Sequence, residues 1–455
     1  MDPVTLKCVA DWAGGALIQG VPEAAVTAVS TDSRKAGPGD LFVALKGDRF
    51  DAHDFLAQVS ENGASCFLVS HLISATEGFE GGIVHVKDTL AGLQSLARGY
   101  RRSLSELRVI ALTGSNGKTS TKDFLSGVLS AAHSVSKTAG NLNNHIGVPL
   151  TILRSGVEHN YGVWEMGMNH TGEIEVLAEM ARPDAAVITN IGTAHIEYLG
   201  TREAIAEEKA QLPATLSDSG YCVMPHGDDF FDYVGTQTRA EMISVGFESG
   251  DVRAEGMALD ESGRVHFDLV SAFSDSVPVI LPVRGRHMVS NALLAAAVGL
   301  REGLSPALIA EALAAVKLSG GRLEEKSVGG YSILDDSYNA NPDSMFAALS
   351  TLSEARVKGR RVAVLGYMGE LGHLEEEAHL ALGAQAAELK VDLLVTVGEK
   401  AARIHSRAGA VPVNLNFSTH AEAVQYLRNE LSGDDLVLVK GSRGASMEKV
   451  IEGLN

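Results

Sequence analysis

The feature that most constrains this chain is a glycine-rich loop within residues 108–122, RVIALTGSNGKTSTK. An apolar run typical of a strand leads into the loop, and a helix is expected to begin at Lys118 and Thr119, so the segment predicts a strand–loop–helix unit of an α/β fold. Gly114 and Gly117 let backbone N–H groups face an anion, Lys118 adds a positive charge, and the Thr119 hydroxyl can bind Mg²⁺. A plain glycine turn seldom places Lys-Thr directly after its second glycine. We therefore expect a nucleotide's phosphates at Gly114, Ser115, Asn116, Gly117, Lys118, Thr119 and Ser120.

Composition limits the class of protein. The 455 residues are 45% hydrophobic, and no apolar run approaches the roughly 20 residues of a membrane helix, so we expect no membrane insertion and several domains. The N-terminus lacks signal-peptide features, and Cys8, Cys66 and Cys222 are odd in number and scattered, which favours reduced thiols in the cytoplasm. A formal net charge of −19 argues against a nucleic-acid partner, because affinity for nucleic acid comes from Lys and Arg.

The pattern of strand-like runs predicts two α/β units at the start of the chain. Runs at residues 40–45, 66–70 and 82–86 predict a small domain at 1–106, and the strand of the phosphate loop then opens a second domain at 107–317. Within the second domain, strands are expected at residues 109–113, up to Glu165, and at 185–190. Their alternation with amphipathic stretches predicts a mostly parallel sheet with ligands at its carboxyl edge. Between residues 244 and 282, short alternating runs indicate an antiparallel insertion or edge.

A third α/β unit, doubly wound, is expected at residues 318–455. Gly320 and Gly321 follow a helical stretch and mark a hinge, because two adjacent glycines end a helix and leave the backbone free to rotate. Strands are predicted at residues 331–334, 361–365, 393–397 and 436–439, and helices at 342–354 and 375–389. The expected fold class is thus α/β in three domains: a small N-terminal domain, a central phosphate-loop domain with a mostly parallel sheet, and a C-terminal Rossmann-like domain.

Three polar side chains are candidates for chemistry near the loop. Glu165 ends a strand and can hold Mg²⁺, and His195 follows another strand in the run TNIGTAH. Lys209 lies in a helix with a Thr cap; a neutral lysine amine can take up CO₂ and become a carbamate, an anionic oxygen ligand. Each residue taken alone is more often a solvated surface group, and it is their place beside a phosphate loop that favours function.

Together with these residues, motifs along nearly the whole chain resemble the Mur ligase family. The motifs are STDSR at residues 30–34, DLFVALKG at 40–47, FDAHD at 50–54, GNLNN at 140–144, DDSYNANP at 335–342 and KGSR at 440–443. The resemblance implies an ATP-dependent ligase that adds D-alanyl-D-alanine to UDP-N-acetylmuramoyl-tripeptide through an acyl phosphate. The first domain would bind the UDP-sugar, the central one ATP and the third one the amine, in a monomer that closes about the hinge.

The resemblance also implies roles for individual residues. Lys118, Lys209 and His195 would be catalytic, and two Mg²⁺ ions would be held by Thr119, Glu165, His195 and a carbamylated Lys209. Besides the loop, the nucleotide would contact Asn291, Arg322, Asp336 and Asn339. The UDP-substrate would contact Ser33, Arg34, Lys46, Asn141 and Asn144.

Two positions depart from the family pattern. Tyr367 stands where the family has an acid, at the expected dipeptide site, and His145 stands near the muramyl substrate where Asp is common. The rival interpretations are another amide-forming ligase of the superfamily, for a folate or a different Mur step, and a nucleotide-operated switch ATPase. The base that deprotonates the amine is left open between His170, His287 and other groups, as is the choice between lysine and diaminopimelate in the tripeptide.

Overall fold

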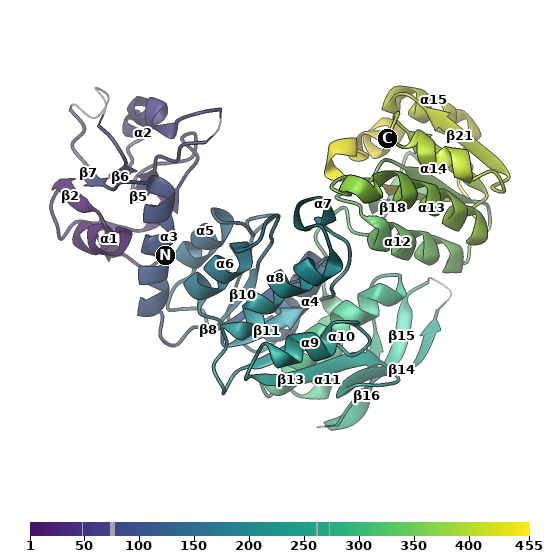
Figure 1. The fold of residues 1–455 in the computed structure, drawn as a ribbon, viewed down its shortest axis with the longest axis horizontal. Helices are drawn as coiled ribbons and strands as arrows, with labels where there is room; N and C mark the ends of the chain where they lie inside the picture. Colours follow the sequence, from purple (N-terminus) through teal and green to yellow (C-terminus); the bar gives the residue numbers. More distant parts are fainter. Residues whose placement is uncertain (48, 73–77, 261–262, 273) are drawn as a thin grey trace.

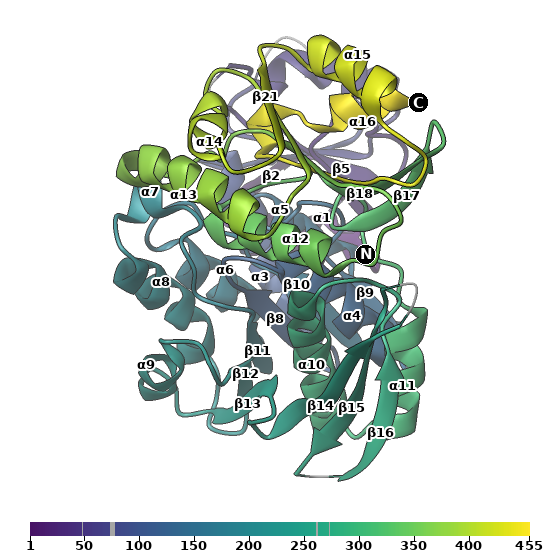
Figure 2. The same ribbon diagram turned by 90° about the vertical axis from the view of Figure 1, so that its right-hand side faces the viewer.

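Three α/β domains follow one another along the chain in the computed structural model, so the predicted fold class is confirmed. The N-terminal and C-terminal domains lie toward opposite ends of the longest axis, and the central domain lies between and below them (Figure 1). In the view turned by 90°, helices α12 (Pro342–Glu354) and α13 (Glu375–Glu388) of the C-terminal domain lie on the side of that domain facing the central one (Figure 2). The structure describes residues 1–47, 49–72, 78–260, 263–272 and 274–455.

The N-terminal domain is built on a five-stranded sheet with the order β2-β7-β6-β5-β4, in which β2 is antiparallel to β7 and the other pairs are parallel. A two-stranded antiparallel sheet of β1 and β3 lies beside it. The elements are β1 Val4–Thr5, α1 Leu6–Ala13, β2 Ala16–Gln19, β3 Ala25–Val26, β4 Ala28–Ser30, β5 Asp40–Val43, a 3₁₀ turn Ala52–Phe55, α2 Leu56–Glu61, β6 Cys66–Val69, β7 Gly82–His85 and α3 Thr89–Ser103.

The central domain has a nine-stranded sheet with the order β16-β15-β14-β13-β12-β11-β8-β10-β9. Its elements are β8 Arg108–Thr113, α4 Lys118–Ser130, β9 Val135–Lys137, α5 Gly147–Arg154, β10 Tyr161–Glu165, α6 Glu173–Ala181, β11 Ala185–Ile188, α7 Ile196–Leu199, α8 Arg202–Ala214, β12 Tyr221–Pro225, α9 Phe231–Thr236, β13 Glu241–Phe247, β14 Val252–Leu259, β15 Val265–Ser271, β16 Ser274–Ile280, α10 Arg286–Arg301 and α11 Pro306–Ala315.

The C-terminal domain has a six-stranded sheet with the order β17-β18-β22-β19-β20-β21, parallel except for the β17–β18 hairpin. Besides α12 and α13, its elements are β17 Glu324–Val328, β18 Tyr331–Asp336, β19 Arg361–Leu365, a 3₁₀ turn Gly372–Leu374, β20 Leu393–Val397, α14 Ala402–Arg407, β21 Val413–Phe417, α15 His420–Glu430, β22 Leu436–Lys440, a 3₁₀ turn Arg443–Ala445 and α16 Glu448–Leu454.

The middle of the central sheet explains where the site forms. Every residue of β10 and β11 is buried, as is all of β8 after Arg108, because helices cover both faces of these parallel strands. Their carboxyl ends therefore meet at one edge, where the backbone leaves the sheet and polar side chains gather. Helix α4 begins at this edge and packs against α10 through apolar side chains of one continuous core.

The expected elements are found with small shifts at their ends. The antiparallel edge expected between residues 244 and 282 is confirmed, because β14 pairs antiparallel with β15 and β15 with β16. β13, which begins at Glu241, pairs in parallel with both β12 and β14 and so ends the parallel part of the sheet. The three cysteines are free thiols, as predicted. No helix in the described ranges is long and apolar enough to cross a membrane. The domain boundaries at 106/107 and 317/318 stay predictions.

Candidate functional site

The phosphate loop has two positions that only glycine can occupy. Gly114 has φ +150°, and a Cβ there would lie 1.8 Å from the Thr189 hydroxyl oxygen. Gly117 has φ +77° at the N-cap of α4, and a Cβ would lie 2.5 Å from the Asn291 amide oxygen. Both side chains would clash in the left-handed region that L-residues avoid. The loop is thereby held tightly against the end of β11 and the start of α10.

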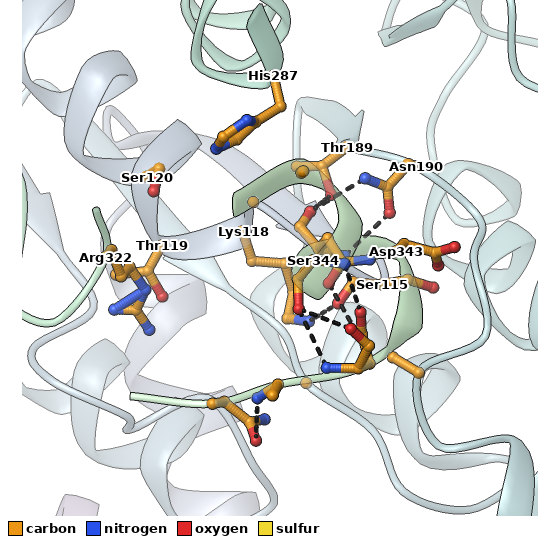
Figure 3. Close-up of a pocket in the computed structure, with 18 of the residues that line it drawn as sticks. Ser115, Lys118, Thr119, Ser120, Thr189, Asn190, His287, Arg322, Asp343 and Ser344 are labelled. Carbon is orange, nitrogen blue, oxygen red and sulfur yellow. Dashed lines mark hydrogen bonds between the residues drawn. The ribbon is translucent and has the colours of Figure 1, made fainter. Parts of the chain in front are cut away.

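Lys118 folds back over this loop. Its ammonium donates hydrogen bonds to the carbonyl oxygens of Gly114 at 2.6 Å and of Ser115 at 3.3 Å, and Figure 3 shows it beside Ser115. Burial is the main cause that lowers its pKa, and the nearby Glu165 carboxylate opposes that shift. A cation beside the N-terminus of α4 is placed to meet an anion that the loop amides bind.

Thr119 and Glu165 lie together as predicted. The Thr119 hydroxyl donates to the Glu165 carboxylate at 2.9 Å, and the carboxylate is almost completely buried. Two partners that the sequence analysis did not single out complete its surroundings: the Asn143 amide donates to it at 2.9 Å, and the Lys122 ammonium lies at 3.4 Å. Hydroxyl and carboxylate oxygens are the ligands that Mg²⁺ prefers, so this pair fits a Mg²⁺ ion beside the phosphates.

His195 lies at the same edge, directly before α7, with a left-handed backbone at φ +66°. Its Nδ1 is 2.7 Å from the Glu370 carboxylate, which comes from the C-terminal domain. Residues 368–371, which include Glu370, continue the family pattern after Tyr367. The contact with His195 had no local signal, because it joins segments more than a hundred residues apart. His170, which the sequence analysis left open as a base, is exposed and pairs with Glu173 at 3.6 Å.

Lys209 is buried in α8, with only 1% of its surface exposed. Burial, with a smaller contribution from the Lys118 charge, holds its pKa well below the usual value for lysine. The amine is therefore readily available in the neutral form that CO₂ addition requires. Lys209 is not among the residues that line the main cavity, whereas His195 is. The neighbouring Glu208 does not pair with Lys209 but accepts hydrogen bonds from the backbone N–H groups of Gly172 and Ile174, both at 2.7 Å.

On the C-terminal side, the predicted nucleotide residues form a second network. The Arg322 guanidinium lies 4.1 Å from the centre of the Tyr338 ring. Asp336 pairs with the Lys440 ammonium at 2.5 Å, and the same ammonium donates to the Asn339 carbonyl at 2.9 Å. Lys440 lies in the quoted KGSR motif but was not predicted as a site residue; as the last residue of β22, it is buried beside the end of β18.

A cavity of about 1110 Å³ separates the two networks and is lined by both. The domains touch across it: the Asn341 amide donates to the Asn116 amide oxygen at 2.7 Å, and the Thr193 N–H donates to the Asp343 carboxylate at 3.2 Å. Figure 3 shows Asp343 and Ser344 of α12 close to Ser115 of the loop. The structure thus holds the C-terminal domain against the phosphate loop.

The five residues expected to contact the UDP-substrate differ in their relation to the main cavity. Asn141 and Asn144 line the main cavity, but Ser33, Arg34 and Lys46 do not. Arg34 forms a bidentate ion pair with Asp32, with both contacts at 2.9 Å, and its side chain is 80% exposed.

The departures from the family pattern also line the cavity, since both Tyr367 and His145 are found there. The Tyr367 hydroxyl fills space beside Gly444, where a Cβ would lie 2.3 Å away. His287, left open as a base, has its pKa lowered to about 4 by burial and by the Lys440 charge. It is therefore neutral at neutral pH and a weak proton acceptor.

Three family models match successive parts of the chain. The model described as Mur ligase family, catalytic domain, matches residues 25–101. The Mur ligase middle domain matches residues 112–299, and the Mur ligase, glutamate ligase domain, matches residues 321–443. The second match contains the phosphate loop, Glu165, His195 and Lys209.

Similar proteins match along their whole lengths. The UDP-N-acetylmuramoyl-tripeptide--D-alanyl-D-alanine ligase of Bacillus subtilis (strain 168) is 37% identical, over 99% of this chain and 98% of its own. The protein of the same name from Escherichia coli (strain K12) is 37% identical, over 100% of this chain and 99% of its own. A crystal structure of MurF from Acinetobacter baumannii is 36% identical, with a TM-score of 0.92 over 100% of this chain and 99% of that one. Sequence, fold and site geometry agree, and the chain belongs to the Mur ligase family.

Proposed function

We propose that this chain is a cytoplasmic, ATP-dependent ligase that joins D-alanyl-D-alanine to UDP-N-acetylmuramoyl-tripeptide and so forms the pentapeptide precursor of peptidoglycan. The observation that carries the proposal is the agreement of full-length likeness with geometry: relatives with this activity in their names match the chain from end to end, and the cavity joins a phosphate loop to a second α/β domain. A switch ATPase has no need of Glu165, His195 and Lys209 together.

To form an amide bond, the enzyme must make one oxygen of the substrate carboxylate a good leaving group. ATP does this by forming an acyl phosphate, and Lys118 with the loop amides would hold the γ-phosphoryl group in line with the attacking carboxylate. Mg²⁺, when bound at Thr119 and Glu165, neutralises the phosphate charge. ADP leaves as the γ-phosphoryl group passes to the carboxylate. The amine of the dipeptide then attacks the acyl carbon, loses a proton, and displaces inorganic phosphate as the amide bond forms.

The second half of the proposal concerns Lys209 and His195. We assign a second Mg²⁺ to His195 and a carbamylated Lys209, supported by the low pKa that burial gives the Lys209 amine and by the place of His195 on the cavity wall. Asn291, Arg322, Asp336 and Asn339 would contact the nucleotide. The two charged networks on opposite walls would then enclose the acyl phosphate and exclude water from it.

The domains divide the substrates. Residues 1–106 would hold the UDP-sugar through Ser33, Arg34 and Lys46, while Asn141 and Asn144 would contact the part of that substrate nearer the loop. Residues 107–317 would bind ATP, and residues 318–455 would bind the amine beside Tyr367. A monomer suffices for this arrangement, because the described residues place both walls of the cavity on one chain.

One assay tests the proposal. The protein is incubated with ATP, Mg²⁺, D-alanyl-D-alanine and either the lysine or the diaminopimelate form of the UDP-tripeptide, and the pentapeptide and ADP are quantified. We expect product with at least one tripeptide and ADP release that requires both the tripeptide and the amine. Steady ATP hydrolysis without either substrate would instead indicate a switch ATPase. Glutamate addition to a folate would indicate the other branch of the superfamily.

A further inference from the structure

The loop around Glu370 docks on the segment that carries His195. The Glu197 N–H donates to the Glu370 carbonyl at 3.2 Å, and a Cβ at Gly372 would lie 3.1 Å from the Glu197 Cα. Glu370 and His195 both have left-handed backbones, with φ +60° and +66°. Non-glycine residues rarely adopt this conformation, and such strain persists where surrounding structure imposes it and concentrates at functional sites. Two strained residues therefore meet across one domain interface.

The side chains of this pair are poised for one hydrogen bond. Nδ1 of His195 is buried and makes no aligned hydrogen bond, and the nearest charged acceptor is the Glu370 carboxylate, 2.7 Å away. A histidine that binds a metal ion through one ring nitrogen usually presents the N–H of the other to a carboxylate, which fixes the tautomer and the plane of the ring. The position of Glu370 matches that partner.

The loop that carries Glu370 is held in place by a contact with His379 of α13. The Met368 N–H, two residues earlier, donates to Nε2 of His379 at 2.9 Å, and His379 is a completely buried residue of α13. Its other ring nitrogen contacts the Glu375 carbonyl. Burial and both contacts hold the loop in one conformation, so the carboxylate is presented to His195 by a rigid support.

We propose that Glu370 is a positioning residue that completes the second Mg²⁺ site from the opposite domain. By accepting the Nδ1 proton of His195, it leaves the Nε2 lone pair directed at the ion. Because Glu370 belongs to the C-terminal domain, the second ion is held firmly only when that domain is docked, and metal affinity reports on closure. This inference rests on the proposed function, since it requires His195 to be a ligand.

The test counts bound ions in the full-length protein. Mn²⁺ binding is measured by electron paramagnetic resonance in the presence of a non-hydrolysable ATP analogue and UDP-tripeptide, for the wild type, Glu370→Ala, Glu370→Gln and His195→Ala. We expect two ions in the wild type. In Glu370→Ala the weaker ion should lose about 10- to 100-fold in affinity while the tighter one is unchanged. Glu370→Gln retains an acceptor oxygen, so its affinity for the weaker ion should lie between those of the wild type and Glu370→Ala.

Activity provides a second readout that a merely structural role would not give. The Mg²⁺ concentration for half-maximal turnover should rise in Glu370→Ala, and turnover at saturating Mg²⁺ should recover most of the wild-type value. Glu388→Ala is the matched control, because it removes the same charge from an exposed side chain of the same domain, at the far end of α13. It should change neither measurement. If Glu370→Ala has a lowered melting temperature, Glu370→Gln carries the comparison alone.

The results distinguish a failure of the inference about Glu370 from a failure of the proposed second Mg²⁺ site. If Glu370→Ala and Glu370→Gln bind both ions as tightly as the wild type while His195→Ala loses one, the inference is overturned and the proposed metal site stands. If the wild type binds a single ion and His195→Ala binds it equally well, the second site is wrong and the inference falls with it. A loss of both ions in Glu370→Ala would also contradict the inference, since it assigns Glu370 to one ion alone.

Discussion

The two walls of the main cavity are organised alike but differ in how deeply they are buried. On the central wall, the Glu165 carboxylate is 2% exposed and meets Thr119, Asn143 and Lys122 within its own domain. On the C-terminal wall, the Asp336–Lys440 pair is also formed within one domain, but Tyr338 is 37% and the Glu370 side chain 44% exposed. The main ion pair or hydrogen bonds of each wall are therefore made within its own domain.

This difference separates two kinds of contribution. Charges on the buried central wall act in a medium of low polarisability, so their effect on a phosphoryl group is large. Contacts between the walls, such as Asn116 with Asn341, are single hydrogen bonds near solvent and contribute less each. We call the contacts Asn116–Asn341 and Thr193–Asp343 the seam between the walls. Mutations on the central wall should thus abolish ligation, and mutations at the seam should slow it.

The largest effect is expected for Lys118→Ala. It removes the loop's cation, and the loss of such an electrostatic group typically lowers turnover about 100-fold or more. Steady-state ligation and the melting temperature are measured together, because the fold should be intact. Lys87→Ala, at an exposed position, is the control. Turnover close to that of the wild type would mean that the nucleotide binds elsewhere.

Lys209→Ala should be nearly as severe but rescuable. If a carbamate at Lys209 supplies oxygen ligands, small carboxylic acids such as acetate or formate can occupy the vacated space and restore part of the turnover. Activity is followed against acid concentration, with Lys118→Ala as the control, since a lost cation cannot be replaced by an anion. Absence of rescue in a variant with an unchanged melting temperature would argue against the carbamate.

The central wall was predictable from sequence because its signals are local. The spacing of Gly114, Gly117 and Lys118 fixes a strand–loop–helix unit, and a buried strand that ends in Glu165 must deliver that side chain to the same edge. The paired apolar runs of the parallel sheets were predictable for the same reason. The antiparallel edge was predictable as well, because the alternating run at residues 265–270 is typical of such a strand, and β15 pairs antiparallel on both sides.

What joins the walls was not predictable. Asn143, Lys440 and Glu370 lie in segments that resemble the family, and Lys122 follows the phosphate loop. Their contacts were not predictable, because the partners lie farther along the chain and no spacing rule links them. The separation of Ser33, Arg34 and Lys46 from the cavity likewise depends on how two domains sit, which motif composition does not encode.

Restricting the hinge should give an intermediate effect. Gly321 has φ +72°, so the double change Gly320→Ala and Gly321→Ala adds strain of roughly 1–2 kcal/mol at the left-handed position. Just before it, Ser319 donates to the Asp123 carboxylate of α4 at 2.7 Å through its hydroxyl, which anchors the linker to the phosphate-loop helix. With one end anchored, rotation is left to the glycines, and we expect turnover to fall about 10-fold with little change in ATP affinity.

The hinge experiment has a matched control in Gly303→Ala. Gly303 has φ +87° and open space around its Cβ position, so it adds similar backbone strain away from the linker. Turnover and the affinity of an ATP analogue are measured for both variants. Equal loss in the two would show that strain alone, rather than domain motion, limits the rate.

The smallest effect is expected at the seam itself, for Asn341→Ser. Serine retains an N-cap for α12, since Asn and Ser cap helices about equally well, but it is too short to reach Asn116. The variant therefore removes one hydrogen bond between the walls without weakening the helix, a net loss of about 0.5–1.5 kcal/mol. We expect turnover to fall about 2- to 10-fold, with an unchanged melting temperature. Asn341→Ala, which loses the cap as well, should in addition melt at a lower temperature. Asn341→Ser could instead lower turnover as much as Lys118→Ala does. In that case the contact between the walls matters as much as the charges of the central wall, and the proposed difference between them is wrong.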